Sequence, residues 1–308
     1  MIKIVAFIVL LIPQLLFADQ PVSEKKAGKV EAYKLACNKG VSEQCVSVGF
    51  IYRYGKEGVT QNEKEAFKWY EKGAKQGDAE AQFYLGMFYQ TGKIVTYNRK
   101  KALLWYKKSA TQGNAKAQLN LGTLYLNAKN EKEAFKWFEK SAKQGEAWAQ
   151  YNVGTYYYSG NGSVTKNLKE AFKWFEKSAK QGNVEAQYNL GMLYKNGQGA
   201  TQNKKEAFKW HEKAAKQGKS EAQLSIGISY SSGEGVAQNK RESIKWFKKA
   251  AEQGNAVAQF NLGVYYFNGQ GGVAQDNKEA VKWFEKAAKQ GDKNAISTLN
   301  YLRKQQGN

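Results

Sequence analysis

Tryptophan recurs at a nearly constant interval, and no other feature of this chain constrains its fold as strongly. The periodic residues are Trp69, Trp105, Trp137, Trp174, Trp210, Trp246 and Trp283, separated by 36, 32, 37, 36, 36 and 37 residues. The string KEAFKW ends at the tryptophan in several copies, for example at 64–69, 132–137 and 205–210. A period of this length is typical of proteins that stack one small structural unit many times.

The residues around each tryptophan predict a helix with a marked start and end. An amide or carboxylate side chain that can cap a helix stands seven residues before the tryptophan, and a glycine suited to the left-handed end of a helix stands eight residues after it. Six copies place glutamate three residues after the cap, which predicts a reciprocal capping box, whereas the copy with Lys101 does not. The caps are Asn62, Asn98, Asn130, Asn167, Asn203, Asn239 and Asp276, and the glycines are Gly77, Gly113, Gly145, Gly182, Gly218, Gly254 and Gly291.

A second helical pattern alternates with the first. Strings such as AEAQFYLGMFY at 79–89 and VEAQYNLGMLY at 184–194 repeat Ala, Leu and Tyr at helical spacing. Neither helix of a pair can bury its apolar stripe alone, so neighbouring pairs must stack. We therefore predict an all-α solenoid of about seven helix pairs over residues 29–304, undivided by a flexible linker and followed by a short tail at 305–308.

The repeat as a whole resembles the Sel1-like repeat of the tetratricopeptide superfamily. The resemblance rests on A-x-x-x-L-G-x-x-Y, a glycine-rich loop and K-x-A-x-x-W-[YF]-x-K-A-A-x-x-G, and it covers nearly all of 29–304. It implies a right-handed αα superhelix that acts as a protein-binding scaffold. In bacteria it also implies secreted proteins involved in host contact or envelope organisation.

The amino-terminal residues predict export. Lys3 precedes an apolar run at 4–16 that is shorter than the roughly 20 residues of a membrane-spanning helix. Ala18 supplies a small residue before the polar Asp19. We interpret residues 1–18 as a signal peptide cleaved after Ala18, and residues 19–28 as a flexible leader. The mature chain is then periplasmic or secreted, without a membrane span.

The chain has two cysteines, Cys37 and Cys45, on either side of the Gly40 turn. This arrangement resembles that of the secreted cysteine-rich Sel1-like proteins, which implies a disulfide between adjacent helices. A disulfide also suits an oxidising compartment. A metal pair or a redox pair remains an alternative, although no further cysteine and one histidine are present.

No catalytic site is predicted, and no metal or cofactor is expected. Some cysteine-rich relatives carry a β-lactamase or penicillin-binding label, which makes a β-lactam-binding protein the alternative function. An S-x-x-K string runs from Ser163 to Lys166, but the S-D-N and K-T-G elements that serine penicillin enzymes also need are missing from the sequence. His211 occupies a position that other copies fill with Tyr or Phe, which indicates packing rather than catalysis.

Polar residues recur on the first helix of each pair, which lines the concave groove in superfamily relatives. Their amides could bind an extended peptide, or they could pack between repeats; both interpretations stay open. They are Gln82, Gln118, Gln150, Gln187, Gln223, Gln259, Asn120, Asn152, Asn189 and Asn261. Trp148 is a further groove residue, the one tryptophan off the period. An exposed Trp148 would be an interface anchor, and a buried one would cover apolar surface beside the shortened loop at 127–130.

Lysines form a second candidate surface. The formal net charge is +21, and a basic surface favours anionic partners. Six tryptophans have a lysine directly before them and another three residues after them; the two lie four apart on one helix face, where like charges repel. They predict a basic ribbon, or else a face that only keeps the chain soluble. The ribbon residues are Lys68, Lys72, Lys136, Lys140, Lys173, Lys177, Lys209, Lys213, Lys245, Lys249, Lys282 and Lys286. Anionic envelope polymers are a possible partner, and nucleic acid is not expected.

Overall fold

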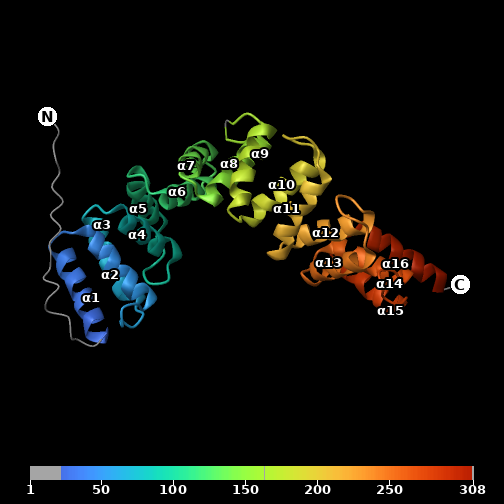
Figure 1. Cartoon of the computed structure of the whole chain (residues 1–308), viewed down its shortest axis with the longest axis horizontal. Coiled ribbons are helices and arrows are strands. Elements are labelled where there is room, and N and C mark those ends of the chain that lie inside the picture. Colours follow the sequence, from blue (N-terminus) through green and yellow to red (C-terminus); the bar gives the residue numbers. More distant parts are fainter. Residues whose placement is uncertain (1–21, 163, 307–308) are drawn as a thin grey trace. The chain divides into compact units, whose positions relative to one another are not determined.

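The computed structural model describes residues 22–162 and 164–306, and this part of the chain forms sixteen α-helices and no strand (Figure 1). The helices are α1 (Val22–Asn38), α2 (Ser42–Tyr54), α3 (Glu63–Lys75), α4 (Ala79–Thr91), α5 (Arg99–Thr111), α6 (Ala115–Asn127), α7 (Glu131–Lys143), α8 (Ala147–Ser159), α9 (Leu168–Lys180), α10 (Val184–Asn196), α11 (Lys204–Lys216), α12 (Ser220–Ser232), α13 (Lys240–Glu252), α14 (Ala256–Asn268), α15 (Asn277–Lys289) and α16 (Lys293–Gln306). The predicted all-α class is confirmed.

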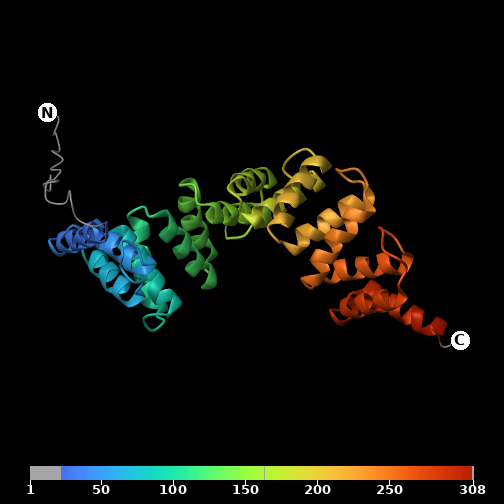
Figure 2. The same cartoon turned by 60° about the horizontal axis from the view of Figure 1, so that its bottom comes forward.

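The chain divides into two compact units, residues 1–124 and 125–308, with the boundary inside α6. We predicted one undivided solenoid over 29–304, and the division falls in the repeat with the shortened loop. Within each unit, helices that are consecutive in the sequence pack against one another, as α2, α3, α4 and α5 do in the first unit and α8 to α16 do in the second (Figure 2). Each even-numbered helix is the first of its repeat, and each odd-numbered helix from α3 onward carries the periodic tryptophan.

The predicted helix ends are confirmed. In all seven tryptophan-bearing helices the cap side chain accepts a hydrogen bond from the amide three residues later. The terminal glycines have φ between 85° and 102°, the left-handed conformation that favours glycine. Both ends of each helix are therefore fixed locally.

The predicted capping box is wrong in its second half. The cap's own amide donates to a tyrosine carbonyl of the preceding helix, for example from Asn203 to Tyr194 at 2.9 Å. The glutamate that should accept this proton turns instead to a lysine one turn later, as Glu206 does with Lys209 at 2.6 Å. Because the loop brings the chain back to the end of the previous helix, the amide of the cap residue bonds the tyrosine carbonyl there rather than the glutamate side chain.

The glycines of the first helices make room for aromatic rings. A Cβ on Gly227 would lie 2.5 Å from the ring of Phe247, and one on Gly86 would lie 2.7 Å from Tyr106. Tyr106 and Phe247 are almost completely buried. Each glycine therefore costs about 1 kcal/mol of helix propensity but permits the close crossing on which the pair is built.

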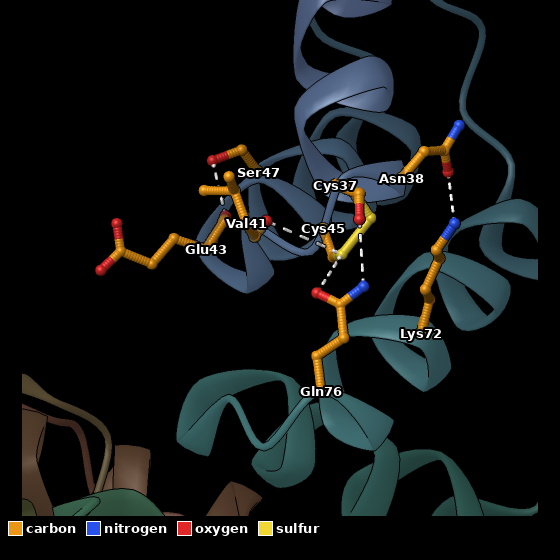
Figure 3. The surroundings of a disulfide bond; sticks show 8 residues. All are labelled: Cys37, Asn38, Val41, Glu43, Cys45, Ser47, Lys72 and Gln76. Carbon is orange, nitrogen blue, oxygen red and sulfur yellow. Dashed lines mark hydrogen bonds between the residues drawn. A yellow bond between two sulfur atoms is a disulfide. The ribbon is translucent and has the colours of Figure 1, made fainter. Parts of the chain in front are cut away.

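The first two helices are joined by the predicted disulfide between Cys37 and Cys45, which the structure confirms (Figure 3). The amide of Gln76 donates to the carbonyl of Cys37 at 3.0 Å and ties this end to α3. On the loop-entropy model, closing so short a loop stabilises the terminal repeat by about 2 to 3 kcal/mol.

The amino-terminal predictions meet the structure only in part. The proposed signal peptide, residues 1–18, lies outside the described residues. Helix α1 begins at Val22, so the second part of the predicted leader 19–28 is helical rather than flexible. Among residues 22–162 and 164–306, none of the helices combines the length and apolar character needed to cross a membrane.

Candidate functional site

The recurring glutamines of the first helices are buried between repeats. Their amides donate to the carbonyl of the alanine eight residues earlier, as Gln187 does to Ala179 at 3.2 Å. The same donation is made by Gln82, Gln118, Gln150, Gln223 and Gln259, at 3.0 to 3.3 Å. All six are buried. Of the two interpretations that the sequence left open, these contacts favour packing between repeats over a peptide-binding groove, because the side chains already bond the backbone inside the stack.

A second set of glutamines, at the ends of the tryptophan-bearing helices, completes this network. Gln217 donates to the side-chain oxygen of Gln187 at 2.8 Å and to the carbonyl of Gly182 at 3.0 Å. The side-chain pairs Gln112–Gln82, Gln181–Gln150, Gln253–Gln223 and Gln290–Gln259 repeat it at 2.7 to 2.9 Å. The sequence analysis missed this role, although glutamine precedes every terminal glycine and its recurrence could have indicated it.

A lysine stands directly before six of the seven periodic tryptophans, and it has an acidic partner on its own helix. Lys68, Lys136, Lys173, Lys209, Lys245 and Lys282 each pair with the glutamate three residues earlier, at 2.6 to 3.7 Å. These exposed pairs contribute little to stability, but they partly cancel the charge of the row.

The lysine three residues after each tryptophan lies over the indole ring. Lys72, Lys108, Lys140, Lys177, Lys213, Lys249 and Lys286 have their ammonium nitrogens 3.9 to 5.8 Å from the ring centroids. Cation–π contacts of this kind stabilise by about 0.5 to 1 kcal/mol at exposed sites. The predicted ribbon is thus two rows with different local partners, and these contacts offset the repulsion expected between lysines four residues apart.

Trp148 is exposed, with 51% of its surface accessible, in the first turn of α8. Its ring meets Tyr151 edge to face at 5.9 Å between centroids. Tyr151 in turn lies 5.8 Å from Phe175 of α9, and the exposed Tyr158 at the far end of α8 lies 6.5 Å from the same ring. Trp148, Tyr151 and Tyr158 fall on one face of α8, with Thr155 between the last two, so this face presents a stripe of three aromatic side chains.

A cavity of about 200 Å³ opens where this stripe meets α10. Tyr158 of α8, Phe175 of α9, and Tyr188, Asn189, Met192 and Leu193 of α10 line it. Asn189 is the predicted groove residue at this cavity, and it is half-buried, as are Asn120, Asn152 and Asn261 on their own helices. The sequence did not indicate Tyr158, Phe175 or Met192, whose roles depend on how three helices pack.

The comparisons with known proteins settle the family. The family model described as Sel1 repeat matches residues 45–78, 79–114, 115–146, 149–183, 184–219, 220–255 and 256–292. The chain belongs to the Sel1 repeat family. Among curated proteins, none matches this Sel1 repeat protein.

Two solved structures resemble this Sel1 repeat protein over most of its length. One is a protective antigen present in uropathogenic Escherichia coli strains, displaying an SLR fold, which is 30% identical in sequence and superposes with a TM-score of 0.71. The match covers 89% of this chain and 67% of the antigen's chain. The other is a Sel1 repeat protein from Oxalobacter formigenes, which is 33% identical in sequence and superposes with a TM-score of 0.65. The match covers 92% of this chain and 83% of the Oxalobacter chain. These likenesses confirm the solenoid fold.

His211 of this Sel1 repeat protein is 2% exposed and packs against Gly191 and the ring of Tyr188. Burial, together with the charge of Lys195, lowers the pKa of its imidazole to about 4, although a hydrogen bond to the backbone of Tyr188 opposes the shift. The ring is therefore neutral near pH 7 and fills the space that an aromatic ring fills in other repeats.

The remaining chemical candidate of the Sel1 repeat protein was the string from Ser163 to Lys166. Ser163 lies outside the described residues. Within the described ranges, no group of three or more His, Cys, Asp or Glu side chains is placed to hold a metal ion.

Proposed function

We propose that this protein is a periplasmic or secreted scaffold that binds another protein on the face formed by α8 and α10. The observation that carries the proposal is the exposure of Trp148 at one end of α8, whose other end lines an open aromatic cavity with Tyr158. Tryptophan is prominent among the few residues that dominate binding energy at protein interfaces. Equivalent positions of other first helices hold Glu80, Lys116, Glu185, Glu221 and Val257, so stacking does not require an aromatic residue there.

The surface has the chemistry of a peptide-binding groove. The cavity between Tyr158 and Met192 is large enough for one apolar side chain of a partner, and its walls are mostly apolar. Asn152 and Asn189 offer amide donors and acceptors on the same two helices. A partner segment that places an apolar residue in the cavity and a second one against Trp148 fits this arrangement.

Export is supported by two independent observations. The apolar amino-terminal run followed by Ala18 has the pattern of a signal peptide. The disulfide between Cys37 and Cys45 belongs to an oxidising compartment. The partner is then an envelope or extracellular protein.

The test is capture of partners from envelope and host-cell extracts by the purified protein and by W148E. Because other repeats place Glu80 or Glu185 at this position, W148E should fold normally while losing the anchor. We expect at least about tenfold weaker capture of the partner that the unmodified protein retains. The matched control is V257E, which replaces the 47% exposed Val257 at the equivalent position of α14. Equal capture by W148E and the unmodified protein would refute the proposal, as would equal loss in V257E.

A further inference from the structure

Helix α5 departs from the other tryptophan-bearing helices in its charge. It contains Arg99, Lys100, Lys101, Lys107 and Lys108 and no acidic residue. Each of the other six contains a glutamate in the first turn and at least one more further along. In five of them the later glutamate stands two residues after the tryptophan, whereas α13 has Lys248 there and carries Glu252 instead. Helix α5 is thus the one of the seven without internal charge cancellation.

The lysines of α5 surround an exposed leucine. Leu104 is 50% exposed, and it stands where all six remaining repeats have the lysine that precedes the tryptophan. Lys100 and Lys101 lie one turn before it, and Lys107 and Lys108 lie one turn after it, so all five share one face of the helix. Tyr97, which is 59% exposed, stands directly before the cap Asn98 and adds a second apolar side chain at this end.

The charge of this face is available. In the part of the chain that the structure describes, none of the four lysines has a carboxylate partner. Lys101 lies over the ring of Tyr89 at 5.0 Å and Lys108 over that of Trp105 at 4.6 Å, contacts that orient the ammonium groups without neutralising them. Arg99 is engaged separately, with the carbonyl of Leu124 at 3.1 Å.

We propose that the outer face of α5 docks on an anionic lipid surface. Lysine is depleted from protein–protein interfaces. A row of lysines around a leucine is the composition of helices that lie on membranes, where the ammonium groups reach the headgroups and the apolar side chain enters the interface. Tyrosine favours the same depth. This surface is separate from the cavity on α8 and α10, and it would hold the scaffold at a membrane surface without spanning the membrane.

The sequence itself supplies variants for the test. K101E and K107E together give α5 the glutamates that α11 has as Glu206 and Glu212, so the double variant should fold at least as well as the unmodified protein. The pair K205E and K248E makes the same charge change on α11 and α13, at exposed lysines equivalent to Lys100 and Lys107. Binding to vesicles of phosphatidylglycerol mixed with phosphatidylcholine is measured by co-sedimentation.

We expect K101E with K107E to weaken binding by about tenfold or more, and K205E with K248E to weaken it much less. Equal losses in both pairs would show attraction by net charge alone and overturn the proposal. Equal binding to vesicles of pure phosphatidylcholine would overturn it as well. Retention on polyglutamate without binding to vesicles would show an acidic-protein site instead.

L104K separates apolar insertion from charge. It gives α5 the lysine of the other repeats and raises the positive charge, so an electrostatic contact alone would bind more tightly. We expect severalfold weaker binding to the same vesicles because the leucine no longer enters the interface. Tighter binding of L104K would contradict insertion.

Discussion

Helices α5 and α11 make the same capping and glutamine contacts but have different outer faces. Asn98 and Asn203 cap them in the same way, and the amides of Gln112 and Gln217 bond the glutamine of the first helix of their own repeat in the same way. Outward, however, α5 presents lysines around Leu104, whereas α11 presents lysine–glutamate pairs. Positions that recur in all repeats therefore maintain the stack, and positions that depart from the repeat give each helix its own surface.

The largest effect on stability is expected at the buried ring, which is Tyr106 in α5 and His211 in α11. The imidazole is neutral in the folded protein, with a pKa of about 4 against the ordinary 6.5. Between these values the unfolded chain binds the extra proton, so stability is complete above pH 6.5 and falls as the pH drops toward 4. At roughly 1.4 kcal/mol per pKa unit, the loss approaches about 3 kcal/mol.

Urea unfolding as a function of pH measures this loss. H211F places the phenylalanine of α9 and α13 at this position and should remove the same component of the pH dependence. The carboxylates titrate equally in both proteins and cancel in the difference. Identical pH profiles for the two would show that His211 is not the group responsible.

A smaller effect is expected from the shared glutamine network. Q187A deprives Gln217 and the carbonyl of Ala179 of their partner inside the stack, and Q82A does the same to Gln112 and Ala74. Each should lower the free energy of unfolding by about 1 to 3 kcal/mol. Chemical denaturation should give similar losses for both variants and almost none for the exposed control K205A. Unequal losses would mean that the glutamine contacts around Gln187 and Gln82 do not contribute equally to stability.

The smallest effect is expected at the first turn of each helix. A negative side chain near a helix start is favourable by about 0.3 to 1 kcal/mol, so K101E should stabilise the protein by that amount. E206K should destabilise it by a similar amount, because it places a lysine in the first turn of α11, where α5 has Lys101. Thermal unfolding of the two variants provides the measurement, and a destabilised K101E would show that Lys101 also has a structural role.

The local features of the fold were predictable because their causes are local. A cap such as Asn203 and the amide it satisfies lie three residues apart, and a glycine such as Gly218 marks a left-handed residue wherever a helix ends in this way. Periodicity supplied the pairing of helices. The missing half of the capping box was not predictable, since it depends on a loop that returns Asn203 to Tyr194.

The candidate site was predictable only in outline. Gln187 could face a peptide or the stack, and its partner Gln217 belongs to the next tryptophan-bearing helix, which recurrence alone does not reveal. Trp148 stood out because it breaks the repeat, but its exposure depends on the packing around Tyr151. The cavity beside Tyr158 and Met192 exists only where three helices meet.

The glutamine pairs also bear on how such a chain can change its length. Each pair joins side chains 30 or 31 residues apart, from the first helix of a repeat to the end of the second helix of the same repeat. If a gene lost or gained one whole period between equivalent codons in residues 145–291, every remaining glutamine would still meet a glutamine. Unequal recombination can therefore shorten or lengthen this part of the chain without leaving a buried amide unpaired, and the surface residues of each inserted copy can then diverge.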